Sequence, residues 1–221
     1  MNNHVNKAGF WMAIFAFAAT GTFVISQLLQ LYGALRYPMD EILIYGSSLC
    51  IAIPFVLAIL ALHYVTPDEQ KFWSHAALIC SVMYAVFVIA NYVVQLATVI
   101  PQTIRGTADD VQLLRQTPHS MFWDFDAIGY ILMGLAMLAA LPAIDNKGFH
   151  KWLRLSFLAN ALTTPAIALV YFYPQFSYRL LILGYPWALT APLAMLMLAI
   201  SFRKNISLNR SVSDMVLLTQ S

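Results

Sequence analysis

Long apolar stretches alternate with short polar connections along the whole chain. Each stretch supplies about the 20 residues that a helix needs to cross a bilayer. Lipid cannot satisfy free backbone N–H and C=O groups, so stretches of this kind must form helices. The pattern predicts an all-α integral membrane protein, a bundle of six transmembrane helices in a single domain (1–204) with a tail (205–221). The predicted spans are 8–34, 42–65, 75–100, 121–144, 155–173 and 180–202.

Composition supports this assignment and restricts the kinds of partner that we expect. Hydrophobic residues make up 61% of the chain and charged residues only 10%, whereas soluble domains average about 25% charged. We therefore expect the lipid bilayer to be the main partner. The net charge of +2 is scattered without basic runs, so we expect no nucleic-acid partner.

Motifs that bind cofactors or metals are absent from the sequence, and we expect no cofactor. The chain contains no glycine-rich phosphate loop, no H-E-x-x-H, no C-x-x-C and no G-x-S-x-G, the patterns that mark several common catalytic sites. His63 and His75 flank one short connection and are conceivable metal or haem ligands. Histidines at the ends of spans are more often simply solvated, so we assign no metal site.

Lysine and arginine are divided unevenly between the two sets of connections. Membrane proteins carry the excess of these residues on the cytoplasmic side. The set that includes both termini holds eight, and the other set holds four, which predicts cytoplasmic termini. The eight are Lys7, Lys71, Lys147, Lys151, Arg154, Arg203, Lys204 and Arg210, and the four are Arg36, Arg105, Arg115 and Arg179. The length and six-span layout resemble those of many bacterial inner-membrane proteins, so we expect that membrane.

The longest connection, 102–120, has its own predicted structure. Thr107 is followed three residues later by Asp110, a spacing typical of a helix start, and apolar residues follow. We expect a short helix on the outer membrane surface. Thr117 and Pro118 then resemble an N-cap and a first helical position, which would begin the fourth span.

The third span carries its polar residues on one helical face, because they recur at spacings of three, four and seven. A polar face inside a membrane must contact protein or water. It either forms hydrogen bonds to neighbouring helices or lines a ligand pocket, and the sequence leaves both open. The residues are Ser81, Tyr84, Asn91, Gln95 and Thr98.

The fourth span contains two carboxylates, Asp124 and Asp126. Two residues correspond to about 200° of helix rotation, so only one of them is expected to face the interior. Asp126 lies about 12 Å along a helix that starts near Pro118, and Tyr130 follows four residues later on the same face. Asp126 is therefore the strongest candidate for a functional ionisable group.

Three classes of function remain open. The first is a membrane protein that binds or transports a small solute or lipid through a polar pocket in the outer half of the bundle. The second is an accessory or assembly subunit, and the third is a membrane-embedded enzyme, for which the sequence offers no catalytic residue. The sequence does not specify the oligomeric state. The candidate ligand-binding residues are Asp126, Tyr130, Asn91, Gln95, Tyr84 and Gln27.

Overall fold

The computed structural model describes residues 2–219, and every regular element in that part of the chain is helical. The third span is continuous from α3 (Lys71–Val94) through a π-helical turn (Gln95–Val99) into α4 (Ile100–Ile104). Four short 3₁₀ segments connect or extend the longer helices, at Asp68–Gln70, Ala108–Leu114, Leu141–Ala143 and Ile182–Gly184. The helices are α1 (Asn2–Leu31), α2 (Met39–Val65), α3 (Lys71–Val94), α4 (Ile100–Ile104), α5 (Met121–Ala140), α6 (His150–Phe172), α7 (Tyr178–Leu181) and α8 (Tyr185–Thr219).

Six helical segments within the described residues are long and apolar enough to cross a membrane. They confirm the predicted all-α bundle of six transmembrane helices and fit a multi-pass membrane protein. The largest difference in bounds is in the third span, which is longer than predicted at both ends. The segments are Asn3–Leu31, Met39–Val65, Asp68–Ile104, Met121–Ala143, His150–Phe172 and Arg179–Ile206.

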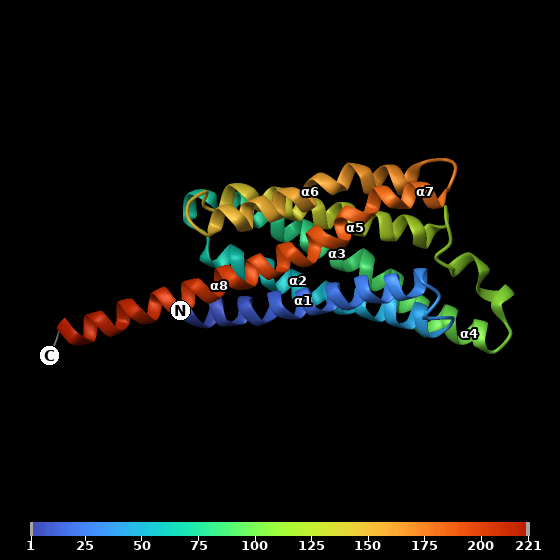
Figure 1. Ribbon diagram of the computed structural model, residues 1–221, viewed down its shortest axis with the longest axis horizontal. Coiled ribbons are helices and arrows are strands. Elements are labelled where there is room, and N and C mark those ends of the chain that lie inside the picture. Colours follow the sequence, from blue (N-terminus) through green and yellow to red (C-terminus); the bar gives the residue numbers. More distant parts are fainter. Residues whose placement is uncertain (1, 220–221) are drawn as a thin grey trace.

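The six spans form a closed ring, in which each packs against its neighbours in the chain. The order around the ring is α1, α2, α3, α5, α6 and α8, and α8 returns to α1. Figure 1 shows that α1 begins at the end of the bundle where α8 projects outward, whereas α4 and the following connection lie at the opposite end. We call these the terminus end and the loop end.

Glycines allow α5 to approach both of its neighbours closely. A Cβ added at Gly134 would lie 1.8 Å from Oγ1 of Thr164 on α6, and one at Gly129 would lie 2.9 Å from Cγ2 of Val88 on α3. Small residues serve this purpose in membrane proteins, where packing between helices replaces the hydrophobic driving force. These contacts fix the position of α5, the helix that carries Asp126.

The start of α5 differs from the prediction. The N-cap is Ser120, whose hydroxyl accepts a hydrogen bond from the backbone N–H of Trp123 at 3.2 Å. The prediction that Thr117 and Pro118 begin this helix is therefore wrong. Asp126 lies about 8 Å along the helix rather than about 12 Å, and so is nearer to the loop end than expected.

The connection at the loop end contains the predicted short helix, in 3₁₀ form, over Ala108–Leu114. Thr107 is its N-cap residue, but its hydroxyl makes no capping hydrogen bond. It donates instead to the backbone carbonyl of Gln102 at 3.0 Å and to the side-chain oxygen of the same residue at 2.6 Å. The capping role that the Thr107–Asp110 spacing suggests is therefore absent, although the helix is present.

Candidate functional site

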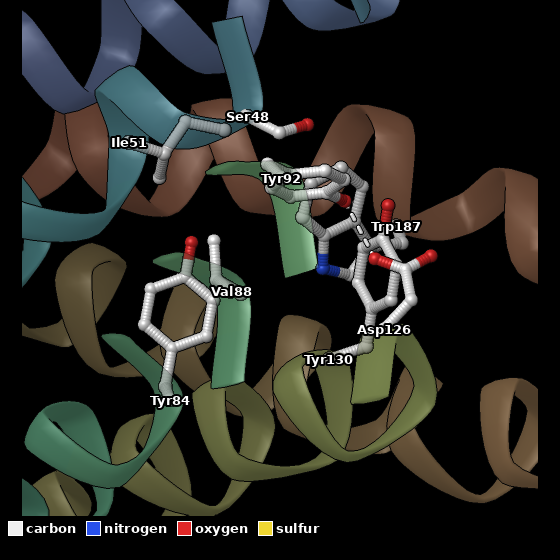
Figure 2. Close-up of a pocket in the computed structure, with 8 residues that line it drawn as sticks. All are labelled: Ser48, Ile51, Tyr84, Val88, Tyr92, Asp126, Tyr130 and Trp187. Carbon is white, nitrogen blue, oxygen red and sulfur yellow. Dashed lines mark hydrogen bonds between the residues drawn. The ribbon is translucent and has the colours of Figure 1, made fainter. Parts of the chain in front are cut away.

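The Asp126 carboxylate lies inside the ring, between α3, α5 and α6. Its side chain is only 4% exposed. The Tyr92 hydroxyl of α3 donates to Oδ1 and the Tyr171 hydroxyl of α6 donates to Oδ2, each at 2.5 Å. Figure 2 shows the first of these bonds within the cluster of aromatic side chains. Such short distances are typical of charge-assisted O–H···O⁻ bonds. Asp124, by contrast, is partly exposed, as the helical rotation predicts.

Gln116, in the connection between α4 and α5, covers this carboxylate from the loop end. Asn91 Nδ2 donates to Gln116 Oε1 at 3.0 Å, and the Gln116 side chain lies close enough to Asp126 to interact with its carboxyl group. Because Oε1 accepts from Asn91, the NH₂ group is the part of Gln116 that can donate to Asp126. These two contacts favour one orientation of the carboxamide.

Gln95 fastens the same connection to the third span. Its Nε2 donates to the carbonyl of Leu114 at 2.7 Å, and its Oε1 accepts from the backbone N–H of Gln116 at 3.2 Å. Gln95 begins the π-helical turn, and turns of this kind are frequent at functional sites. The side chain is 1% exposed, so a buried amide holds a connecting segment over the end of the ring.

A small cavity lies on the other side of Asp126, deeper in the bundle. Its volume is about 10 Å³, roughly the space that one water molecule requires. Four helices supply its walls, and half of the lining residues are aromatic. The lining residues are Ser48 and Ile51 of α2, Tyr84, Val88 and Tyr92 of α3, Asp126 and Tyr130 of α5, and Trp187 of α8 (Figure 2).

Two buried polar atoms near Asp126 have no hydrogen-bond partner within the described chain. One is Nε1 of Trp187, a cavity-lining residue that is 6% exposed, and the other is Oδ1 of Asn91, which is fully buried. Figure 2 shows the indole nitrogen on the cavity side of its ring. Buried polar groups are nearly always paired, and an unpaired one requires an explanation. An unpaired donor and an unpaired acceptor on either side of a carboxylate are suited to hold a small polar molecule.

Charged residues surround the approach from the loop end. Asp40, near the start of α2, accepts a hydrogen bond from Nε2 of Gln30 at 2.9 Å. Glu41 interacts electrostatically with Arg115, which directly precedes Gln116 in the chain. The Tyr45 ring stacks on that of Tyr92 at 5.5 Å between centroids. Polar groups thus extend from the surface to the hydroxyl that binds Asp126.

The structure brings five of the six candidate residues together. Asp126, Tyr130 and Tyr84 line the cavity, while Asn91 and Gln95 lie on the loop side of the carboxylate. Gln27 does not join them, because its side chain is exposed on α1. The assignment of Gln27 rested on depth alone, and depth does not specify which way a side chain points.

Sequence reasoning missed four residues of the site, which are Tyr92, Gln116, Tyr171 and Trp187. Tyr171 and Trp187 lie toward the ends of spans, where aromatic residues ordinarily mark the membrane interface. Gln116 lies in a connection, where a glutamine is expected to be solvated. One signal was available for Tyr92, which follows Tyr84 by eight residues and so falls on the polar face of α3.

The two histidines at the terminus end approach each other. The rings of His63 and His75 have centroids 5.5 Å apart, and Nδ1 of His63 lies 2.8 Å from Oγ of Ser74. Within the part of the chain that the structure describes, no three His, Cys, Asp or Glu side chains gather as a metal site would require.

Comparisons with known proteins do not identify the chemistry of this site. No protein-family model, curated protein or solved structure matches the chain.

Proposed function

We propose that this protein binds a small polar solute beside Asp126, in the half of the bundle near the loop end, and exchanges it with the outer side of the membrane. The connection 102–120 covers the site. With the orientation that the positive residues favour, the loop end faces outward and both termini are cytoplasmic. A bacterial inner membrane is the setting that we propose.

One observation carries this proposal: a buried carboxylate is flanked by polar atoms that lack partners. A structural network satisfies its own members, since each unpaired buried group costs free energy. Here the Trp187 donor and the Asn91 acceptor are unused, and Asp126 lies among them. Ionisable residues within membrane spans commonly mark the pathway of a substrate or ion.

Thermal unfolding of the purified protein in detergent, with a panel of small amides, alcohols, amines and carboxylates, tests the proposal. A solute that binds only the folded state raises the melting temperature. We expect at least one solute to stabilise the wild type and Asp124→Asn but not Asp126→Asn. Asp124 is the matched control, because the same charge is removed from the same helix outside the site.

A second measurement on the same three proteins tests transport. A solute found in this way should enter proteoliposomes containing the wild type or Asp124→Asn, and should not enter those containing Asp126→Asn. If the two aspartate variants respond alike to every solute, the solute-binding function is wrong. Loss of a co-purifying protein from Asp126→Asn alone would then favour the accessory-subunit alternative.

A further inference from the structure

Gln116 places a carboxamide directly against the buried carboxylate. Its Oε1 accepts from Asn91 at 3.0 Å, and its NH₂ group is the part that can donate to the neighbouring Asp126 carboxyl group. The side chain thus presents one acceptor and one donor to a complementary pair of groups on α3 and α5. Gln116 belongs to a connection and is partly exposed, so it can leave the site without separating the spanning helices.

We propose that the solute is a small uncharged primary amide, and that Gln116 occupies its position as a tethered analogue when the site is closed. This inference rests on the proposed solute-binding function and specifies its ligand. Opening would withdraw Gln116 together with Leu114 and Arg115, and would break the two hydrogen bonds by which Gln95 holds the backbone of this segment.

Hydrogen-bond chemistry distinguishes amides from other small solutes at this position. A ligand needs a donor toward Asp126 and an acceptor toward Nδ2 of Asn91. A carboxylate places like charge beside Asp126, and an ammonium ion has no acceptor for Asn91. An alcohol carries both functions on one oxygen, whereas Gln116 uses two separate atoms. A primary amide supplies both atoms.

The unpaired acceptor beside this position is consistent with a free amide. Oδ1 of Asn91 is fully buried and has no partner. Gln116 is held by its own backbone and by Gln95, which restricts where its second N–H can point. A free amide has no such tether, so its second N–H can reach Oδ1 of Asn91. An untethered ligand thereby satisfies a group that the tethered one leaves unpaired.

Chemical rescue tests the proposal directly. Gln116→Ala removes the terminal methylene and the carboxamide, and acetamide supplies the same heavy atoms without the covalent link. We expect acetamide to raise the melting temperature of Gln116→Ala in a concentration-dependent manner. The shift should be much smaller in the wild type, where Gln116 competes, and absent from the Gln116→Ala, Asp126→Asn double variant.

N,N-Dimethylacetamide is the matched control, because it keeps the carbonyl but has no N–H for Asp126. If it stabilises Gln116→Ala as well as acetamide does, or if acetamide has no effect, the amide assignment is wrong. Stabilisation of Gln116→Ala by methylammonium or an alcohol instead would overturn the amide class and leave the solute-binding function standing. If no solute distinguishes Gln116→Ala from the double variant, both proposals fail. Gln116→Ser provides the same test should the alanine variant not fold.

Discussion

The two halves of the ring satisfy their buried polar groups in different ways. Toward the terminus end, buried hydroxyls mostly return to their own helix: Ser81 donates to the carbonyl of Leu78, and Ser156 to that of Leu153. The pair of His63 and Ser74, which joins α2 to α3, is an exception. Toward the loop end, polar side chains bond across helices, as Tyr92 and Tyr171 do to Asp126. Local bonds leave helices free to pack through apolar surfaces, whereas bonds across the ring build a site.

The core of each half reflects this difference. Near the terminus end, large apolar side chains such as Phe55, Phe157, Met137 and Leu198 are fully buried. Near the loop end, the interior retains a cavity, and unpaired polar atoms of Asn91 and Trp187 lie near the buried carboxylate of Asp126. Changes in the first region should therefore affect stability alone, whereas changes in the second should affect both stability and solute binding.

The largest effect is expected from Asp126→Leu. This substitution leaves the hydroxyls of Tyr92 and Tyr171 and the amide of Gln116 without their acceptor. An unsatisfied buried donor is costly, and we expect a loss of about 3 kcal/mol of unfolding free energy together with all solute binding. Reversible unfolding in mixed micelles measures the first effect. A loss equal to that of Asp124→Leu would show that the network contributes nothing.

Gly134→Val is expected to cost about 2 kcal/mol by overpacking. The new side chain would collide with Thr164 and separate α5 from α6. Because α5 carries Asp126 and α6 carries Tyr171, which donates to it, solute affinity should fall as well at a temperature where the variant is folded. Unfolding in mixed micelles and a binding titration provide the two values. A variant of unchanged stability would contradict the close helix contact.

Gln95→Leu should cost about 1 kcal/mol and loosen the connection at the loop end. It removes the bonds to Leu114 and Gln116 while retaining a side chain of similar size. Hydrogen exchange of the backbone amide of Gln116, which donates to Gln95, should accelerate. Exchange at the wild-type rate would show that this segment is held by other contacts.

The smallest effect is expected from Ser81→Ala. The hydroxyl of Ser81 donates only within its own helix, so its removal should change stability by less than about 0.5 kcal/mol. Solute affinity should not change. A larger loss in either unfolding or binding would show that the terminus half also contains an interhelical polar network.

The contrast between the halves also explains what could be predicted from the sequence. Hydropathy alone identified the six spans, because the bilayer imposes length and apolarity on every crossing. Helical periodicity correctly separated Asp126 from Asp124 and placed Asn91 and Gln95 on one face. Partners on other helices, such as Tyr171, depend on the order of the ring, which no local pattern encodes. Gln116 depends in addition on the fold of a connection.

The accessibility of the cavity tests most directly whether Gln116 closes a site at the loop end. Ser48→Cys places a thiol in the cavity wall, in a protein whose native Cys50 and Cys80 are replaced by alanine. Its rate of modification by a small methanethiosulfonate reagent, added to the loop side of proteoliposomes, is then compared with and without Gln116→Ala. The account predicts slow labelling that accelerates at least about tenfold when Gln116 is removed, equivalent to about 1.4 kcal/mol. Equal rates in the two proteins would contradict it.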